Sequence, residues 1–304
     1  MRECDVRRDL HVPGKVSQGY DIDQSGIINY RFNSLGFRSE EYDPAAKFRI
    51  CIVGESNAIG VGLRLEDTFG YKLKQHIAAS LQIDSDQVNL INLSIAGASA
   101  DYCIRTLYRQ VPGCSFDLLV CQLPHQARIE YKDESGFRPC HVKAVRVADL
   151  ANAPAPFLAY CDYYNEPVGV INLLKNALLA QVFLKERGIP HVLTTQSLPK
   201  ASARSPYLKD YCGRLDESTI LWHQYFTSLV DRAADKKHAG PRSHAAFAIA
   251  VLGFYGSMQV LGGNPGIGHR VSGYAAHLRA NDGDWKYFNR IMAGRTANAK
   301  PRRA

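Results

Sequence analysis

Five short apolar runs, separated by segments of helical pattern, constrain the fold of this chain more than any other feature. The runs are FRICIVG (48–54), VNLINLSI (88–95), DLLVCQL (117–123), HVLTTQS (191–197) and YFTSLVD (225–231). Continuous apolar runs rich in β-branched residues are typical of strands buried on both faces. Because strands that alternate with helices build parallel sheets through right-handed crossovers, the pattern predicts an α/β fold.

Helical spacing connects these strands. The segment from Asp67 carries apolar residues at helical intervals, with Asp67 or Thr68 as its cap. Further helices are expected around 100–110, over 170–188, where Gly188 ends the helix, over 217–224 and over 244–255. We therefore expect a three-layer α/β/α sandwich with a five-stranded parallel sheet of order 2-1-3-4-5, as in flavodoxin-like folds.

The 304 residues divide into one core and two flanking extensions. The expected bounds are 1–46 for an N-terminal extension, 47–256 for the central domain and 257–304 for a C-terminal extension with a basic tail. Residues 126–168 show no clean period and are interpreted as an insertion or lid, since long irregular connections are often functional. Its aromatic residues either cover a pocket or pack on one another: Phe157, Tyr160, Tyr163 and Tyr164.

Composition argues for a reduced, cytoplasmic protein. The N-terminus MRECDVRRDL lacks the apolar core of a secretion signal, and no run of about eighteen apolar residues predicts a membrane helix. The eight cysteines form no C-x-x-C pair, so no metal site is predicted from them. The net charge of +8 is partly carried by the tail, which is interpreted as a solvated end rather than as a nucleic-acid site.

The first strand ends in a serine, within the stretch RICIVGESNAIGVGL. Ser56 is either an ordinary helix-capping serine or a nucleophile at the carboxyl end of a central strand, where open α/β sheets place their sites. Partners elsewhere in the chain decide between these interpretations. Beyond the fifth run, LVDRAADKKHAG contains Asp235 and His238, three positions apart on one predicted loop.

A serine hydroxyl becomes an effective nucleophile when a base removes its proton. An imidazole can act as that base, and a carboxylate can orient the imidazole and stabilise its cation. In a sheet of order 2-1-3-4-5, the loops after the first and fifth strands meet at the carboxyl edge. The sequence thus predicts a triad of Ser56, His238 and Asp235.

These motifs carry a resemblance to a known family. A G-[DE]-S turn at Gly54–Ser56, the segment NLSIAG at 92–97 and D-x-x-H-x-G from Asp235 stand in the same order. The chain resembles the SGNH, or GDSL-type, hydrolase superfamily from about residue 28 to 256. The resemblance implies the SGNH hydrolase fold, Ser56 as nucleophile, His238 as general base and an oxyanion hole lined by the N–H groups of Ser56 and Gly97.

Two positions depart from the family pattern. Glu55 stands where the family carries an aspartate before the serine, and G-x-N-D is missing after the third strand. The segment Gln122–Arg128 stands there instead, so His125, Gln122 or Gln126 is a candidate for the missing donor. The loss of one such donor costs about 10²–10³ in turnover. Three residues complete the candidate set as substrate-binding: Asn57, Gln122 and Tyr160.

Other local patterns are weaker. The second glycine of G-x-S-x-G is replaced by Ala58, and no G-K-[ST] follows the glycines of a phosphate loop. GGNPGIGHR imitates the Asp–His loop without its aspartate, which argues against His269 as the base. His238 and His244 lack a third metal ligand nearby, and His244 is expected to start a helix.

The resulting hypothesis is a serine esterase or thioesterase acting on a small acyl group, with no cofactor. Its expected partner is a small-molecule acyl ester or an acyl-carrier substrate, with no membrane or nucleic acid. Two alternatives stay open. The first is an acyltransferase that uses an amine or alcohol acceptor, and the second is a non-catalytic binding protein on the same scaffold. The sequence does not indicate the oligomeric state.

Overall fold

The computed structural model describes residues 17–18, 28–133, 136–141, 155–195, 211, 213–222, 230–262 and 264–281. The chain divides into two compact units that interleave in sequence. Unit 1 contains Met1–Ser17, Asn29–Ile59 and Val88–His223, and unit 2 contains Gln18–Ile28, Gly60–Gln87 and Gln224–Ala304. Each unit is described by itself below, and the domain bounds expected from the sequence stay a prediction.

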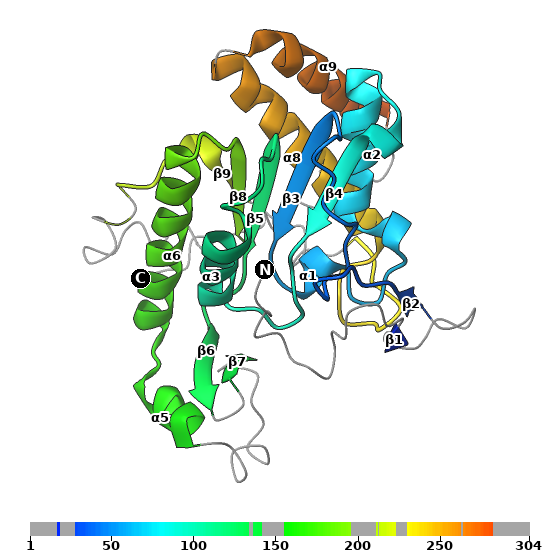
Figure 1. Ribbon diagram of the computed structural model, residues 1–304. Coiled ribbons are helices and arrows are strands. Elements are labelled where there is room, and N and C mark those ends of the chain that lie inside the picture. Colours follow the sequence, from blue (N-terminus) through cyan, green and yellow to red (C-terminus); the bar gives the residue numbers. More distant parts are fainter. Residues whose placement is uncertain are drawn as a thin grey trace, which may run out of the picture. The chain divides into compact units, whose positions relative to one another are not determined.

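A five-stranded parallel sheet forms the centre of unit 1 (Figure 1). Its strands are β3 (Phe48–Val53), β4 (Val88–Asn92), β5 (Leu118–Leu123), β8 (His191–Thr195) and β9 (Ile220–Trp222). They pair in the order β4-β3-β5-β8-β9, all parallel. This order confirms the expected 2-1-3-4-5 arrangement, in which the first strand lies between the second and the third.

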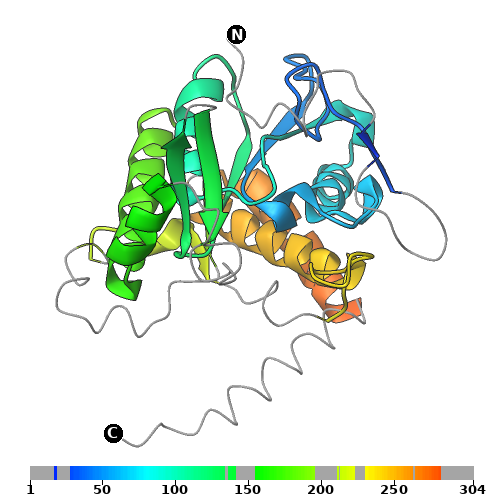
Figure 2. The ribbon, with the colours of Figure 1, turned by 90° about the horizontal axis from the view of Figure 1, so that it is seen from below.

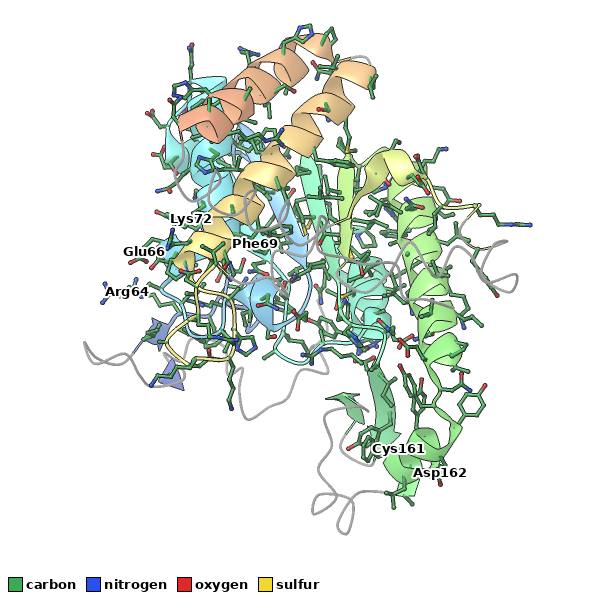
Figure 3. The ribbon with its side chains drawn as sticks, turned by 180° about the vertical axis from the view of Figure 1, so that it is seen from behind. Arg64, Glu66, Phe69, Lys72, Cys161 and Asp162 are labelled. Atoms are coloured by element: carbon green, nitrogen blue, oxygen red, sulfur yellow. The ribbon has the colours of Figure 1, made fainter. Side chains whose placement is uncertain are left out.

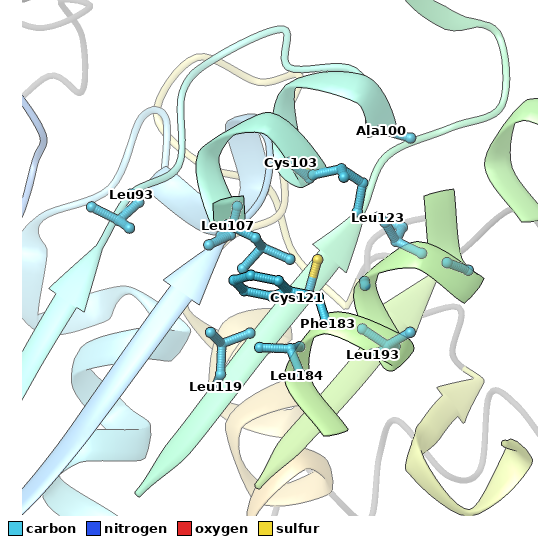
Figure 4. Close-up of a cluster of buried hydrophobic side chains, with 14 of the residues drawn as sticks. Leu93, Ala100, Cys103, Leu107, Leu119, Cys121, Leu123, Phe183, Leu184 and Leu193 are labelled. Atoms are coloured by element: carbon cyan, nitrogen blue, oxygen red, sulfur yellow. The ribbon is translucent and has the colours of Figure 1, made fainter. Parts of the chain in front are cut away.

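Two helices of unit 1 pack with one face of this sheet (Figures 1 and 2). They are α3 (Ala100–Gln110) and α6 (Glu166–Glu186), whose apolar residues share a buried cluster with alternate residues of β5. Figure 4 shows Leu119 and Cys121 of β5 in this cluster, with Phe183 of α6 among them. Alternation along the strand places these residues on one face, since successive strand side chains point to opposite faces.

Residues expected in the N-terminal extension belong to this core. Phe37 is fully buried in the same apolar cluster, just before the chain passes beside β4. There the Glu40 carboxylate accepts the Leu90 N–H at 2.8 Å, and the Ser39 hydroxyl accepts the Asn92 N–H at 2.8 Å. Side-chain acceptors thus satisfy the open edge of β4, which would otherwise offer unpaired backbone groups. Two-residue strands, β1 (Ser17–Gln18) and β2 (Asn29–Tyr30), form a separate small sheet.

The insertion contains more regular structure than the sequence indicated. Strands β6 (Arg128–Asp133) and β7 (Gly136–His141) form an antiparallel hairpin, and α5 (Ala155–Tyr163) follows. Figure 1 shows these elements beyond the carboxyl ends of the sheet strands, and Figure 3 labels Cys161 and Asp162 on α5. Apolar residues alternate with charged ones along RIEYKD, which is a strand signal that the sequence interpretation missed.

The fifth strand lies earlier than expected. Residues 217–224, expected as a helix, form a 3₁₀ turn (Glu217–Thr219) followed by β9, whose residues pair with β8 at Leu193–Thr195. In the expected strand 225–231, Val230 and Asp231 form a bend, and the rest lies outside the described residues. Pairing with β8 therefore determined that residues 220–222 form a strand, although their local pattern was ambiguous.

Helices make up most of the described part of unit 2. They are η1 (Leu65–Asp67), α2 (Phe69–Leu81), η2 (Ser85–Gln87), α8 (Pro241–Leu261) and α9 (Pro265–Asn281). Thr68 caps α2 as expected, because its hydroxyl accepts the Tyr71 N–H at 3.3 Å. Phe69, labelled in Figure 3, packs edge-on against Phe247 of α8 at 4.8 Å between ring centroids.

Helix α9 lies beyond residue 256, in the part of the chain expected as a C-terminal extension. It pairs closely with α8, where Gly256 approaches Ser272 and Gly268 approaches Val260 so tightly that a Cβ at either glycine would clash. The described chain has the elements of the expected three-layer α/β/α class. They are the parallel sheet, helices α3 and α6 in unit 1, and helices α2, α8 and α9 in unit 2.

Two of the described helices, α6 and α8, are long and apolar enough by composition to cross a membrane. Within the fold, however, 56% of the apolar window in α6 and 61% of that in α8 is buried. Core helices share this profile, because burial on most sides selects apolar residues all round.

Candidate active site

Ser56 opens α1 (Ser56–Ile59), a single turn that directly follows β3. The expected position at the carboxyl end of a central strand is therefore confirmed, and the residue is 4% exposed. The turn requires glycine at position 54, where an added Cβ would lie 2.7 Å from the Ala58 Cβ and 2.9 Å from the Gln122 Cβ. The backbone at Gly54 therefore packs closely against β5, and this packing fixes the position of the neighbouring Ser56.

The Glu55 carboxylate organises the residues around the serine. Its Oε2 accepts the Ser56 hydroxyl at 2.8 Å, and its Oε1 accepts the Asn57 amide Nδ2 at 2.7 Å. Arg128 Nη2 lies 3.2 Å from the same Oε2. Asn57, expected as a substrate-binding residue, is therefore held by Glu55 through its amide nitrogen.

Arg128 is a residue that the sequence interpretation missed. It stands first in β6 and is the last residue of the segment Gln122–Arg128, which replaces the expected G-x-N-D motif. The sequence offered one signal for it, a basic residue at the end of the segment that replaces G-x-N-D. Nothing in its local pattern indicated that it would reach Glu55.

Two backbone N–H groups of unit 1 fit the expected oxyanion role. Gly97 lies in the turn after β4 with φ of 82°, a left-handed conformation that favours glycine. Within the described residues, neither the Gly97 N–H nor the Ser56 N–H donates a hydrogen bond. Among the described residues, both groups thus lack an acceptor in the turns that follow adjacent strands, β3 and β4.

The three side chains considered for the missing donor differ in their surroundings. Gln122 is fully buried on β5, and neither atom of its amide has a partner among the described residues. His125 accepts the Ala127 N–H at Nδ1, at 3.1 Å, so a neutral imidazole carries its hydrogen on Nε2. Gln126 donates its Nε2 to the Glu166 carboxylate at 3.3 Å.

Tyr160 lies on α5 among other aromatic rings. It stacks on Tyr164 at 6.3 Å and meets Tyr163 edge-on at 6.4 Å. Burial raises the pKa of the Tyr160 phenol, and the nearby Asp101 charge adds to the rise. These contacts show rings packed on one another, and its expected role in substrate binding stays a prediction.

Asp235 and His238 form a preassembled pair in unit 2. His238 Nδ1 lies 2.5 Å from Asp235 Oδ2, and the backbone N–H groups of His238 and Lys237 each donate to Asp235 Oδ1 at 3.0 Å. Lys236 takes a left-handed φ of 58°, which tightens the turn between the two side chains. With Nδ1 engaged by the carboxylate, Nε2 is the nitrogen that remains for accepting a proton.

Hydrogen bonding keeps the Asp235 carboxylate ionised. Burial alone would raise the pKa of Asp235, but the backbone and side-chain hydrogen bonds from His238 and the Lys237 N–H lower that pKa below its usual 3.8. Gly62 supports the same loop within unit 2, because its carbonyl accepts the Ala234 N–H at 3.1 Å. A Cβ at Gly62 would lie 3.3 Å from the Asp235 Cγ, so the turn after α1 packs directly on the carboxylate.

The histidines rejected as the base or as metal ligands have other places. His269 is exposed on α9, outside any Asp–His turn. His244 lies fully buried near the start of α8 and accepts the Phe69 N–H at Nδ1, at 3.0 Å. Its buried position and backbone partner give His244 a structural role.

The structure brings the candidate residues together in two groups. Ser56, Asn57 and Gln122 gather around the end of β3 in unit 1 with Glu55, while Asp235 and His238 pair in unit 2. Each group is assembled by its own local contacts. The meeting of Ser56 with His238 remains a prediction.

No family model and no curated protein matches the chain. Among solved structures, a lipase from a goat rumen metagenome is similar at 15% identity, covering 67% of this chain and 96% of that chain with a TM-score of 0.41. An esterase from Pseudoalteromonas sp. is 16% identical over 67% and 93% of the two chains, with a TM-score of 0.40. An acetylxylan esterase from Geobacillus stearothermophilus is 12% identical over 71% and 97%, with a TM-score of 0.42. A structural likeness of this size does not assign an activity to the chain. An activity has to be inferred from the residues of the chain itself.

Proposed function

We propose that this protein is a serine hydrolase that cleaves an ester or thioester of a small acyl group through an acyl-Ser56 intermediate. The observation that carries the proposal is the Asp235–His238 pair, with Nδ1 bound to the carboxylate at 2.5 Å. A carboxylate bound at Nδ1 holds the imidazole in the tautomer and orientation that a general base uses and stabilises its cation. The SGNH-type motifs around Ser56 and Gly97 point to the same chemistry.

In the proposed mechanism, Ser56 Oγ attacks the acyl carbonyl while His238 Nε2 takes its proton. Asp235 stabilises the imidazolium that forms, and the N–H groups of Ser56 and Gly97 donate to the oxyanion. The imidazolium then returns its proton to the leaving oxygen or sulfur. Water repeats the sequence on the acyl-enzyme and restores Ser56.

Chain connectivity supports the pairing of nucleophile and base. Residues 57–61 alone separate Ser56 from Gly62, whose carbonyl binds the Ala234 N–H on the Asp235–His238 loop. The turn that follows the serine is thus also the turn that supports the base. One short segment of chain therefore links both parts of the proposed triad.

The proposed substrate is a small-molecule acyl ester or an acyl group on a carrier, and the proposed location is the cytoplasm. An acyltransferase would use the same acyl-Ser56 intermediate with an amine or alcohol in place of water. Product analysis with and without such an acceptor distinguishes transfer from hydrolysis.

Labelling with a fluorophosphonate probe tests the proposal, with intact mass and peptide mapping as the readout. We expect one adduct on Ser56, lost in Ser56→Ala and strongly slowed in His238→Gln. Ser257→Ala, at an exposed serine of α8, is the matched control and should label like the wild type. A folded wild-type protein that takes no adduct, or takes it on another serine, would exclude the mechanism and favour the binding-protein alternative.

A further inference from the structure

One carboxylate oxygen links a cation to the candidate nucleophile. Glu55 Oε2 accepts the Ser56 hydroxyl at 2.8 Å and lies 3.2 Å from Arg128 Nη2. The guanidinium and the serine oxygen therefore cannot be farther apart than these two distances together. One carboxylate oxygen thus separates the paired guanidinium from the atom that would attack the substrate.

The Glu55 carboxylate is buried, and its burial calls for a paired cation such as Arg128. Glu55 is 3% exposed, and a buried carboxylate is costly unless it is paired and hydrogen-bonded. The guanidinium of Arg128 supplies the paired cation. A guanidinium also carries five N–H donors. Among the described residues, the Arg128 guanidinium has one partner, Glu55.

Local structure delivers Arg128 to this position. His125 accepts two backbone N–H groups, that of Ala127 at its Nδ1 (3.1 Å) and that of Arg128 at its carbonyl (2.8 Å). The resulting turn lies between β5, which is beside β3 in the sheet, and β6. Arg128 thus comes from the segment that lacks the family's asparagine, and it approaches Ser56 through its contact with Glu55.

We propose that Arg128 is the third oxyanion donor of this enzyme, in place of the absent asparagine, and that Glu55 is a positioning residue that holds its guanidinium beside Ser56. The inference rests on the proposed function. It names Arg128 as a catalytic residue, since the guanidinium would touch the reacting oxygen. Preorganised donors of this kind commonly supply the largest single term in acyl transfer.

The electron and proton balance of the step is simple. The Oγ–C bond forms, the carbonyl π pair moves to oxygen, and the Ser56 proton passes to His238 Nε2. Arg128 donates hydrogen bonds to the new oxyanion and transfers no proton. Glu55 loses the Ser56 hydrogen bond in this step and keeps its ion pair with Arg128, so the guanidinium remains in place.

Chemical rescue tests the proposal. Arg128→Ala should hydrolyse an uncharged aryl ester with kcat lowered about 10²–10³-fold, while KM changes little. Millimolar guanidinium chloride should restore part of that kcat, because a free cation can occupy the vacated position. Arg128→Lys should retain more activity than Arg128→Ala, since it keeps the charge without the fork.

The matched control is a second arginine–glutamate pair of unit 1. Arg105 Nη2 lies 2.6 Å from Glu130 Oε1, also at a largely buried carboxylate, between α3 and β6. Arg105→Ala should lower the melting temperature without a loss of kcat that guanidinium can rescue. A purely structural role for Arg128 would give both variants this same behaviour.

The outcomes separate the inference from the function on which it rests. Absence of a Ser56 adduct in the wild type would overturn the proposed function. A labelled, active wild type whose Arg128→Ala variant keeps full kcat, or loses kcat without rescue, would overturn the role of Arg128 alone. If Arg128→Ala does not fold, Arg128→Gln decides, because a preserved kcat overturns the proposal and a lowered kcat at constant KM supports it.

Discussion

His238 Nδ1 lies 2.5 Å from Asp235 Oδ2, and the same carboxylate accepts the His238 backbone N–H through its other oxygen. Both the ring and the backbone of the histidine are thus tied to one aspartate. Asp235→Asn would present an N–H to Nδ1 and favour the wrong tautomer of the imidazole. We expect kcat for an aryl ester to fall roughly 10⁴-fold with the fold intact, as measured by steady-state hydrolysis and circular dichroism.

Asp231 provides the control for that variant. Its carboxylate accepts the N–H groups of Arg242 at 2.9 Å and Ser243 at 3.0 Å, which caps the first turn of α8. Asp231→Ala should therefore lower the free energy of unfolding by about 1 kcal/mol while turnover stays close to wild type. A large loss of turnover in this variant would show that the Asp235 effect is not specific.

The lowered pKa of Asp235 predicts how stability depends on acidity. The folded state holds this pKa below its usual 3.8, so the unfolded state binds the proton first as the pH falls. The stabilisation is therefore present above pH 3.8 and is lost as the pH drops below it toward the folded-state pKa. Urea unfolding of wild type and Asp235→Asn should show a stability difference that shrinks over this range. A difference independent of pH would contradict the assignment.

Gly97 should be intolerant of a side chain. Its φ of 82° places it in the left-handed region, where alanine costs about 1–2 kcal/mol. Relief of that strain would also turn its N–H away from the oxyanion, so we expect Gly97→Ala to lower kcat as well as stability. Gly113→Ala is the control, because an added Cβ there meets nothing within 4 Å. Equal kcat in the two variants would remove Gly97 from the site.

His191 should make stability fall in mild acid. Burial lowers the pKa of His191 below its usual 6.5, although the hydrogen bond to the Ile189 carbonyl at 2.9 Å opposes that effect. The neutral ring is favoured in the folded state, so stability decreases as the pH falls below 6.5 and the unfolded state takes up the proton. His191→Leu should flatten this part of the stability–pH curve, measured by chemical unfolding. Parallel curves for the two proteins would refute the prediction.

Much of the architecture followed from local patterns in the sequence. The runs that became β3, β4, β5 and β8 are apolar and β-branched because both of their faces are buried, which leaves a readable trace. Gly188 ended α6 as expected, since its φ of 63° suits a residue without a Cβ. The spacing of three between Asp235 and His238 likewise predicted their contact, because a short turn can hold both side chains together.

The sequence by itself therefore determined the alternation of strands and helices, the serine at the end of β3 and the Asp235–His238 turn, all of which depend on nearby residues. Tertiary structure decided the position of β9, the burial of Phe37, the helix α9 and the placement of Arg128 on Glu55. These features depend on partners distant in the chain, whose contacts leave no period in the sequence. Arg128 lies 73 positions from Glu55, so only the pairing of β5 with β3 and the turn at His125 bring the two charges together.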